Sequence, residues 1–456
     1  MDLDKYSLAE ILMTLSDSKK AVLFLQGPPS TFWRQLADSF EAAGATTFRI
    51  NFSMADWVYW RKAGADNYRG RFSKWADFLE NYINKNGITD ILYYADRLPY
   101  HAVAREVAGQ LGVRAYTMEF GYLRPDWLTL ERGGMGALSH FPNDPASIRE
   151  IARVVGPYKK RSVRYSHKFS QEAFNEVTYN LIASLVPYFY PLYKSDKYYY
   201  PLWDYLGWGP RALRKSRSEP KRLVAVDQLH SAGAPYWMLA LQIQSDYQLR
   251  ANSKYKHQSE MIDEVLASFA SHAPEDDRLI VKLHPLDNGI ERWEKVVQKM
   301  AARYGLIGRV ISVSDCHLRD TIQRSRGVIT INSTVGLHSL RDGTPVKVLG
   351  AAVYDIPGLT HQGSLDSFWE KPQGVDQSLC DDLVSAMAAT IQVQGSFYNR
   401  LGRIAACEEI TRRVLGGFVN EPGAYIVPPP RLKQAIQSGI PIHRSLEGSG
   451  VVPRDD

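Results

Sequence analysis

The chain has 456 residues, a length that favours two domains over a single hydrophobic core. Its 45% apolar and 23% charged residues are ordinary for a globular protein and exclude a largely disordered one. The net charge of +6 suits an anionic ligand or an anionic membrane surface, but no recognition motif accompanies it, so no nucleic-acid partner is expected.

The first half of the chain alternates apolar strands with amphipathic helices, which predicts a parallel α/β sheet. The pattern begins with a strand at 21–25, followed by the turn Gly27-Pro28-Pro29. Ser30 is the expected N-cap of a helix whose apolar face recurs every four residues from Phe32. Further strands are predicted at 48–52, 90–94 and 115–118, and helices at 73–86, 101–111 and 166–187.

Residues 188–222 have a different character, because aromatic residues and proline are dense in the first part and basic residues in the second. The basic residues are Arg211, Arg214, Lys215, Arg217, Lys221 and Arg222. Tyr and Trp favour membrane interfaces and clustered Lys and Arg attract anionic headgroups, so one interpretation is a membrane-facing surface. The other is that the aromatic residues pack beneath an interdomain linker. We place the domain boundary here, after an N-terminal domain of 1–215.

The second half repeats the strand–helix alternation, with a C-terminal domain at 223–375 and closing helices with an extended tail at 376–456. Strands are predicted at 236–243, 279–283, 309–313, 328–331 and 346–349. Helices are predicted at 257–272, 290–304, 317–325, 334–341, 376–393 and 396–415. The predicted fold class is therefore α/β, with two Rossmann-like domains facing one another across a cleft.

Polar residues follow several predicted strands, at the edge where open α/β sheets place their ligand sites. His284-Pro285 ends one strand, and Asn332-Ser333-Thr334 turns another strand into a helix whose first N–H groups suit an anion. Asp246 lies in a cluster with Gln248 and Arg250 after the strand 236–243. Each group also has a purely structural interpretation, as a turn, a helix cap or a buried polar residue.

Two more groups lie at strand ends of the first domain. Glu119 follows the strand 115–118, and Gly121 beyond it allows close backbone approach. Gly27 and Pro28 form the turn after the first strand.

Several signatures are absent from the sequence. There is no Gly-x-x-x-x-Gly-Lys-Ser/Thr loop and no Gly-x-Gly-x-x-Gly after a strand. The only Asp-x-Asp is Asp2 and Asp4 at the terminus, and Cys316, Cys380 and Cys407 form neither a metal nor a disulfide pattern. We therefore expect no metal and no cofactor, and a reducing, cytoplasmic location without a signal peptide or a bilayer-spanning run.

Seven segments together resemble the capsular polysaccharide biosynthesis proteins of the KpsS type, a family of retaining β-Kdo transferases. They are Phe24-Leu-Gln-Gly-Pro-Pro29, Glu119-Phe-Gly-Tyr-Leu-Arg-Pro-Asp-Trp127, Asp246-Tyr-Gln-Leu-Arg250, Ser268-Phe-Ala-Ser-His-Ala-Pro274, Lys282-Leu-His-Pro-Leu-Asp-Asn-Gly289, Asn332-Ser-Thr-Val-Gly-Leu337 and Leu349-Gly-Ala-Ala-Val-Tyr-Asp-Ile-Pro-Gly-Leu359. The resemblance covers about residues 21 to 362.

The resemblance implies a GT-B architecture and a glycosyltransferase that moves the sugar acid Kdo from CMP-β-Kdo to a phosphatidylglycerol-type lipid with retention of configuration. It implies Asp246 as the carboxylate nucleophile and Glu119 as the acid/base or the group that orients the acceptor. His284 would pair with the CMP phosphate. The other expected donor-binding residues are Lys282, Pro285, Asn332, Ser333, Thr334, Gln248 and Arg250, and those on the acceptor side of the cleft are Gly27, Pro28, Tyr122 and Arg124.

The implied location is the inner face of the inner membrane, as a peripheral protein beside other capsule biosynthesis proteins. Two alternatives remain open. A sugar-nucleotide epimerase of similar fold would release a free sugar and need no lipid. A non-catalytic scaffold of a capsule assembly complex would turn over no donor.

Overall fold

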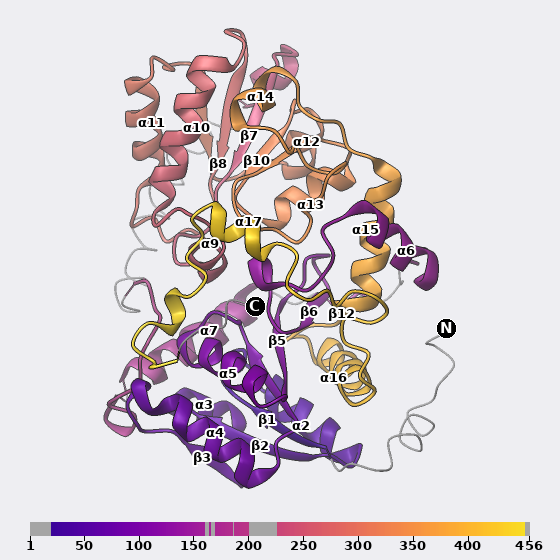
Figure 1. Cartoon of the computed structure of the whole chain (residues 1–456). Coiled ribbons are helices and arrows are strands. Elements are labelled where there is room, and N and C mark those ends of the chain that lie inside the picture. Colours follow the sequence, from indigo (N-terminus) through magenta and orange to yellow (C-terminus); the bar gives the residue numbers. More distant parts are fainter. Residues whose placement is uncertain (1–19, 160–163, 166–168, 186, 200–225, 452–456) are drawn as a thin grey trace.

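The computed structural model describes residues 20–159, 164–165, 169–185, 187–199 and 226–451. These residues form two α/β lobes, an N-terminal lobe at the bottom of Figure 1 and a C-terminal lobe at the top, each built on its own sheet. The predicted fold class of two facing Rossmann-like units is confirmed.

The N-terminal lobe contains a seven-stranded sheet in the order β12-β6-β5-β4-β1-β2-β3. The strands are β1 (Ala21–Phe24), β2 (Thr46–Asn51), β3 (Ala65–Asn67), β4 (Asp90–Tyr94), β5 (Arg114–Phe120), β6 (Trp127–Arg132) and β12 (Gln392–Gln394). Five of them are parallel, but β6 and β12 are antiparallel to their neighbours. The prediction of a parallel sheet is wrong at this edge, because the connection from β5 to β6 is too short for a parallel crossover.

Helices cover this sheet, and aromatic side chains fill the space between them. The helices are α2 (Phe32–Ala42), α3 (Met54–Trp60), α4 (Trp75–Asn86), α5 (Pro99–Gln110) and α7 (Phe169–Leu185). A further helix, α6 (Pro145–Val155), lies away from this sheet and packs against α15 (Gln377–Thr390) (Figure 1). Helix α2 begins one residue later than the sequence predicts. Thr31 is its N-cap, while the hydroxyl of Ser30 accepts a hydrogen bond from the N–H of Phe32 at 3.2 Å.

The C-terminal lobe contains a five-stranded parallel sheet in the order β11-β10-β7-β8-β9. Its strands are β7 (Tyr236–Ala240), β8 (Arg278–Lys282), β9 (Val310–Val313), β10 (Val328–Thr330) and β11 (Val346–Val348). Its helices are α9 (Tyr247–Ala251), α10 (Gln258–His272), α11 (Trp293–Arg303), α12 (Leu318–Gln323), α13 (Thr334–Arg341) and α14 (Leu365–Glu370). The first strand ends before the predicted Ile243, because the side chain of Gln258 takes over both backbone hydrogen bonds of Gln242.

The last part of the chain returns to the N-terminal lobe. After α15 (Gln377–Thr390), β12 joins the edge of the first sheet and α16 (Arg400–Leu415) packs against α2. The predicted helix 376–393 therefore stops early, because the backbone from Ile391 onward pairs with β6. The tail then passes through α17 (Leu432–Gln437) beside both lobes, as the yellow ribbon in Figure 1 shows.

Candidate functional site

Three polar segments meet at one edge of the C-terminal sheet. Strands β8, β7 and β10 are adjacent and parallel, so the residues that follow them leave the sheet on the same side. Asp246 follows β7, His284 follows β8 and Asn332 follows β10. The expectation that the strands before Asp246 and His284 are neighbours in a parallel sheet is confirmed.

Asp246 is held in place as the N-cap of α9. Its carboxylate accepts a hydrogen bond from the backbone N–H of Gln248 at 2.9 Å. Burial raises the pKa of Asp246, while this hydrogen bond and the positive charges of Arg124 and Arg250 oppose the rise. The carboxylate is thus fixed at one edge of a sheet with cations near it.

Glu119 approaches the same place from the other lobe, at the end of β5. Its Oε2 accepts hydrogen bonds from the hydroxyl of Tyr247 and from Nε2 of Gln248, both at 2.6 Å. Burial raises the pKa of Glu119 to about 8, and the charge of Asp246 contributes to the rise. Glu119 therefore keeps a proton near neutral pH. We call this interface between the lobes the seam.

A chain of side-chain amides fixes the C-terminal side of the seam. The side chain of Gln248 accepts a hydrogen bond from Asn252 at 2.6 Å, and Asn252 in turn accepts one from the backbone of Ala137 in the other lobe at 2.9 Å. A Cβ on Gly136 would lie 2.5 Å from Asn252, so a glycine is required where the lobes approach. The amide of Asn332 donates to the carbonyl of Gln248 at 3.1 Å and accepts from Gln242 at 2.8 Å.

The remaining predicted donor-side residues surround this network. Nδ1 of His284 accepts the N–H of Leu286 at 3.1 Å, so Nε2 carries the hydrogen of the neutral ring. Ser333 is the N-cap of α13 and Thr334 its first residue, as the sequence predicts, and Pro285 is exposed. Lys282 is buried, and its ammonium donates to the carbonyls of Leu283 and Ser314, both at 2.9 Å. Its predicted contact with the donor stays a prediction.

The predicted acceptor-side residues divide into two groups. Arg124 lies over the ring of Phe120, at 4.6 Å from the centroid, and its charge acts on Asp246. Burial raises the pKa of the Tyr122 phenol, and the nearby carboxyl groups of Glu131 and Glu119 add to the rise. Gly27 and Pro28 instead line a separate small cavity with residues of α3 and α7. Arg124 and Tyr122 therefore lie with the carboxyl pair, whereas the structure does not bring the Gly-Pro turn to it.

Sequence reasoning missed the pair Asp96 and Arg97 behind the seam, and it noted Glu131 only as lying beyond the Glu119 segment. Asp96 and Arg97 follow β4 and are buried, and Arg97 donates to the carbonyl of Ala251 in α9 at 3.0 Å. Glu131 is fully buried in β6, where burial raises its pKa to about 8. Asp96 and Arg97 are polar residues that follow a predicted strand, which is the pattern that identified Glu119. The sequence therefore contained a signal for them.

Arg431 joins the two lobes from the C-terminal tail. It is buried, and its guanidinium donates to the carbonyls of Phe141 and Pro142 in the N-terminal lobe at 2.6 and 2.9 Å. It also donates to the carbonyls of Ala352, at 3.1 Å, and Val353 in the C-terminal lobe. One side chain thus holds four backbone carbonyl groups across the interface.

The aromatic segment 188–222 is described only as far as residue 199, and the six basic residues from Arg211 to Arg222 lie outside the described residues. Tyr190 is buried and Tyr193 stacks on Tyr100, whereas Tyr188, Phe189 and Leu192 are 89%, 51% and 47% exposed. Part of this aromatic segment therefore packs against the N-terminal lobe, and the membrane-facing interpretation stays a prediction. None of the described helices is long and apolar enough to cross a bilayer.

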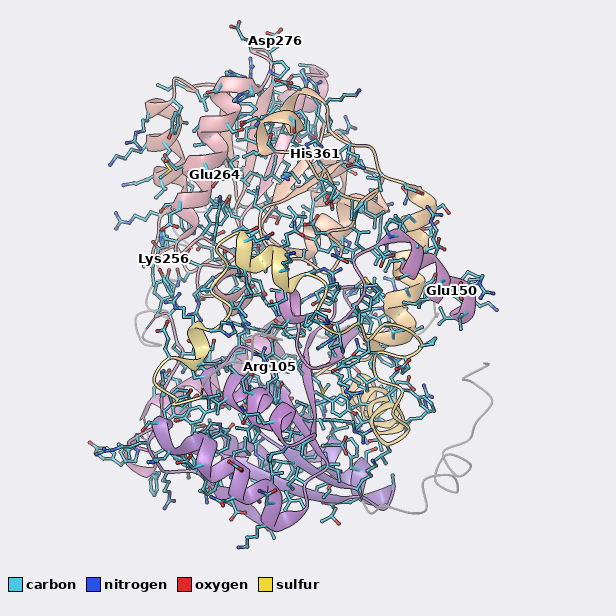
Figure 2. The ribbon with its side chains drawn as sticks, viewed as in Figure 1. Arg105, Glu150, Lys256, Glu264, Asp276 and His361 are labelled. Atoms are coloured by element: carbon cyan, nitrogen blue, oxygen red, sulfur yellow. The ribbon has the colours of Figure 1, made fainter. Side chains whose placement is uncertain are left out.

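No metal site is evident in the part of the chain that the structure describes, where no three His, Cys, Asp or Glu side chains are grouped to hold an ion. Figure 2 shows the whole molecule with its side chains. Arg105, on α5, lies near its middle, Asp276 lies at the far end of the C-terminal lobe, and Glu150 lies at one side on α6.

Two known relatives align with this chain over nearly their full length. The chain is 29% identical to the capsule polysaccharide export protein KpsS of Escherichia coli over 85% of this chain and 99% of that protein. It is also 29% identical to the capsule polysaccharide modification protein LipB of Neisseria meningitidis serogroup B, over 86% of this chain and 94% of that protein.

Among solved structures, the chain is similar to the β-Kdo 2,7-transferase of Thermosulfurimonas dismutans KpsC, with 15% identity and a TM-score of 0.42 over 87% of this chain and 99% of that one. It is also similar to a putative UDP-N-acetylglucosamine 2-epimerase from Listeria monocytogenes, with 12% identity and a TM-score of 0.29 over 90% of this chain and 100% of that one. Likenesses at this level carry no inference about substrate. The family model described as capsule polysaccharide biosynthesis protein matches residues 89–398, more than half of the sequence, and the chain belongs to that family.

Proposed function

We propose that this protein is a glycosyltransferase of capsule biosynthesis, which moves Kdo from CMP-β-Kdo to a phosphatidylglycerol-type lipid with retention of configuration. The observation that carries the proposal is the meeting of Glu119 and Asp246 at the seam, each from a different lobe. Retention at an anomeric carbon needs two inversions, and two carboxyl groups with separate protonation states supply both steps.

Asp246 is the proposed nucleophile. Burial raises the pKa of Asp246, while its backbone hydrogen bond and the nearby guanidinium groups of Arg124 and Arg250 limit that rise and support the anionic form that attack requires. Attack forms a bond from the carboxylate oxygen to the anomeric carbon and breaks the bond to the CMP phosphate, which leaves with the electron pair. Loss of CMP needs no protonation by an acid, because the phosphate is already a good leaving group.

Glu119 is the proposed acid/base. Both hydrogen bonds that described residues donate to it end on Oε2, which assigns the proton to Oε1. Before the second step Glu119 releases its proton to solvent, and the deprotonated form then accepts the proton of the acceptor hydroxyl as that oxygen attacks the anomeric carbon and releases Asp246. A pKa of about 8 lies close to neutral pH, where a group of this kind can both release and accept a proton.

The edge of the C-terminal sheet is the proposed donor site. His284 and the N-terminus of α13, capped by Ser333, supply hydrogen-bond donors for the leaving phosphate. Asn332 and Gln248 bind each other and their neighbours, so they position α9. The exposed side chains of Tyr188, Phe189 and Leu192 are a candidate contact with the membrane that holds the acceptor.

The test is to incubate the protein with CMP-Kdo, with and without a phosphatidylglycerol acceptor, and to measure CMP release and glycolipid. Without acceptor, intact-mass analysis should show a Kdo adduct, and peptide mapping should place it on 246–250. Asp246→Asn should abolish both the adduct and the transfer, while Asp276→Asn, at the far end of the same lobe, should retain them.

Each competing function predicts a different product. Release of a free sugar without any glycolipid supports the epimerase alternative, and the absence of donor turnover supports the scaffold. An adduct on Glu119, or substantial transfer by Asp246→Asn, removes the assignment of Asp246.

A further inference from the structure

One of the seven segments that carry the family resemblance, 349–359, has no part in the proposed site. It follows β11, and its backbone continues beside the end of β10. The N–H of Leu349 donates to the carbonyl of Thr330 at 2.9 Å, and the N–H of Gly350 donates to the carbonyl of Ile331 at 3.1 Å. The segment therefore leaves the sheet at the same edge as the polar residues of the proposed donor site.

The start of this segment holds the end of α9. The backbone N–H of Ala351 donates to the carbonyl of Asn252, the C-cap of α9, at 2.8 Å. A Cβ on Gly350 would lie 2.6 Å from the same carbonyl oxygen, so the backbone can approach this closely only with glycine there. Because α9 begins at its N-cap Asp246, this contact fixes the far end of the helix that carries the proposed nucleophile.

Three residues further on, Tyr354 holds the start of α13. Its side chain is buried, and its hydroxyl donates a hydrogen bond to the carbonyl of Ser333, the N-cap of that helix. The ring lies directly against the first turn, because a Cβ on Gly336 would overlap the hydroxyl oxygen. The carbonyl of Ser333 also accepts the N–H of Gly336 at 3.0 Å, so the tyrosine binds the residue at which the helix begins.

The C-terminal tail fixes the backbone from which Tyr354 projects. The guanidinium of Arg431 donates to the carbonyls of Ala352 and Val353, the two residues directly before it. The segment is thus held at α9 on one side and at the tail on the other. A phenylalanine would fill the same space in the core, so packing alone does not require the hydroxyl. What the hydroxyl adds is the hydrogen bond to Ser333.

We propose that Tyr354 is a positioning residue for the donor phosphate, and that its bond to Ser333 holds the first turn of α13 in a fixed place relative to Asp246. The inference rests on the proposed function, which places the phosphate at this turn. Hydrogen-bond donors stabilise a leaving phosphate only when they are fixed where its charge develops, and the contacts behind them set that position. Because Tyr354 is buried behind the turn, it acts through Ser333 and not by touching the nucleotide.

The experiment is calorimetric titration of the full chain with CMP and with cytidine, which differ only in the phosphate. Tyr354→Phe keeps the ring in the core, and it should weaken CMP binding about three- to tenfold, the effect of one hydrogen bond, while cytidine binding stays unchanged. Tyr304→Phe is the matched control. It removes a hydroxyl that donates to Asp263 at 2.9 Å, at the C-terminal end of α11 in the same lobe, and it should change neither affinity.

The ratio of the two affinities separates the outcomes. If Tyr354→Phe loses CMP and cytidine binding equally, the hydroxyl supports the whole lobe and not the phosphate site, and the proposal is overturned. Unchanged CMP binding, or an equal loss of CMP binding in Tyr304→Phe, also overturns it. In these cases a preference of the wild type for CMP over cytidine leaves the donor site standing. If the wild type binds CMP no more tightly than cytidine, the proposed donor site fails, and this inference fails with it.

Discussion

The two lobes contribute to the seam in different ways. The C-terminal lobe supplies polar groups from three adjacent strands, and many of them bind one another through amides that fix their positions. The N-terminal lobe supplies Glu119, whose side-chain hydrogen bonds among the described residues all come from the other lobe. The polar side chains of the C-terminal lobe are therefore held in position mainly within that lobe. The protonation of Glu119, in contrast, depends on contact between the two lobes.

The sharpest test of this difference is Glu119→Gln. Glutamine keeps the shape of the side chain but has no proton to exchange, so transfer should fall by about 10³-fold, within the usual range for a general acid–base group. The measurement is initial rate of glycolipid formation. Glu150→Gln, an exposed change in the same lobe, should be indistinguishable from wild type. A Glu119→Gln rate within tenfold of wild type would contradict the role.

Arg431→Met breaks the connection between the lobes. It removes all four hydrogen bonds to buried carbonyl groups of both lobes, and the free energy of unfolding should fall by roughly 3–5 kcal/mol. Urea denaturation measures the loss. Lys433→Met, an exposed change two residues further along, should alter stability little. If both variants are equally stable, Arg431 does not hold the lobes together.

His284→Ala tests the donor side alone. Loss of the imidazole should weaken CMP binding by about tenfold, because a hydrogen bond to a charged group is lost while the fold is kept. Calorimetric titration with CMP measures this, and His272→Ala, on the exposed face of α10, is the matched control. Unchanged affinity for CMP would remove His284 from the donor site.

The buried carboxyl groups of the N-terminal lobe make stability depend on pH. Burial raises the pKa of Glu131 to about 8 from a usual 4.5, so between these values the folded protein retains a proton that the unfolded chain has lost. The contribution of Glu131 to the free energy of unfolding is therefore most favourable below about pH 4.5, and it falls as the pH rises toward 8. Glu131→Gln should reduce the fall in Tm between about pH 5 and pH 8. If Tm falls equally steeply with pH in wild type and in Glu131→Gln, Glu131 does not cause the fall.

The smallest expected effect concerns the membrane. Replacing Tyr188, Phe189 and Leu192 by serine should reduce binding to phosphatidylglycerol vesicles several-fold, because exposed aromatic and aliphatic groups partition into the interface. Vesicle co-sedimentation measures it. Ile307→Ser, an equally exposed change in the C-terminal lobe, should leave binding unchanged. A larger loss for Ile307→Ser would place the contact elsewhere.

The sequence predicted most of the strands of both sheets, since each is a short apolar run with a polar end. It missed the reversed strand β6, whose direction depends on the length of the connection from β5, and β12, whose partner lies far away in sequence. It also extended β7 too far, because only the fold brings Gln258 to the backbone of Gln242. Errors thus occur where a long-range contact replaces a local preference.

For the site, strand order was the decisive inference. If the strands before Asp246 and His284 are neighbours in a parallel sheet, both residues lie at the same edge of that sheet. The sequence alone allowed this prediction, and the pairing of β7 with β8 confirms it. The bonding of Glu119 to Tyr247 and Gln248 could not, because it depends on how two separately predicted lobes face each other. The same holds for Arg97, whose hydrogen bond to Ala251 forms only once α9 is in place.

The return of β12 and α16 to the first sheet affects how the protein is made. During synthesis the N-terminal lobe emerges first, but its outer strand and the helix that packs on α2 follow the whole C-terminal lobe. Until then the edge of β6 is unpaired and open to other chains. Cutting the gene between the lobes would therefore not yield two independent domains, and a separately folding N-terminal lobe requires residues 392–415 to be supplied with it.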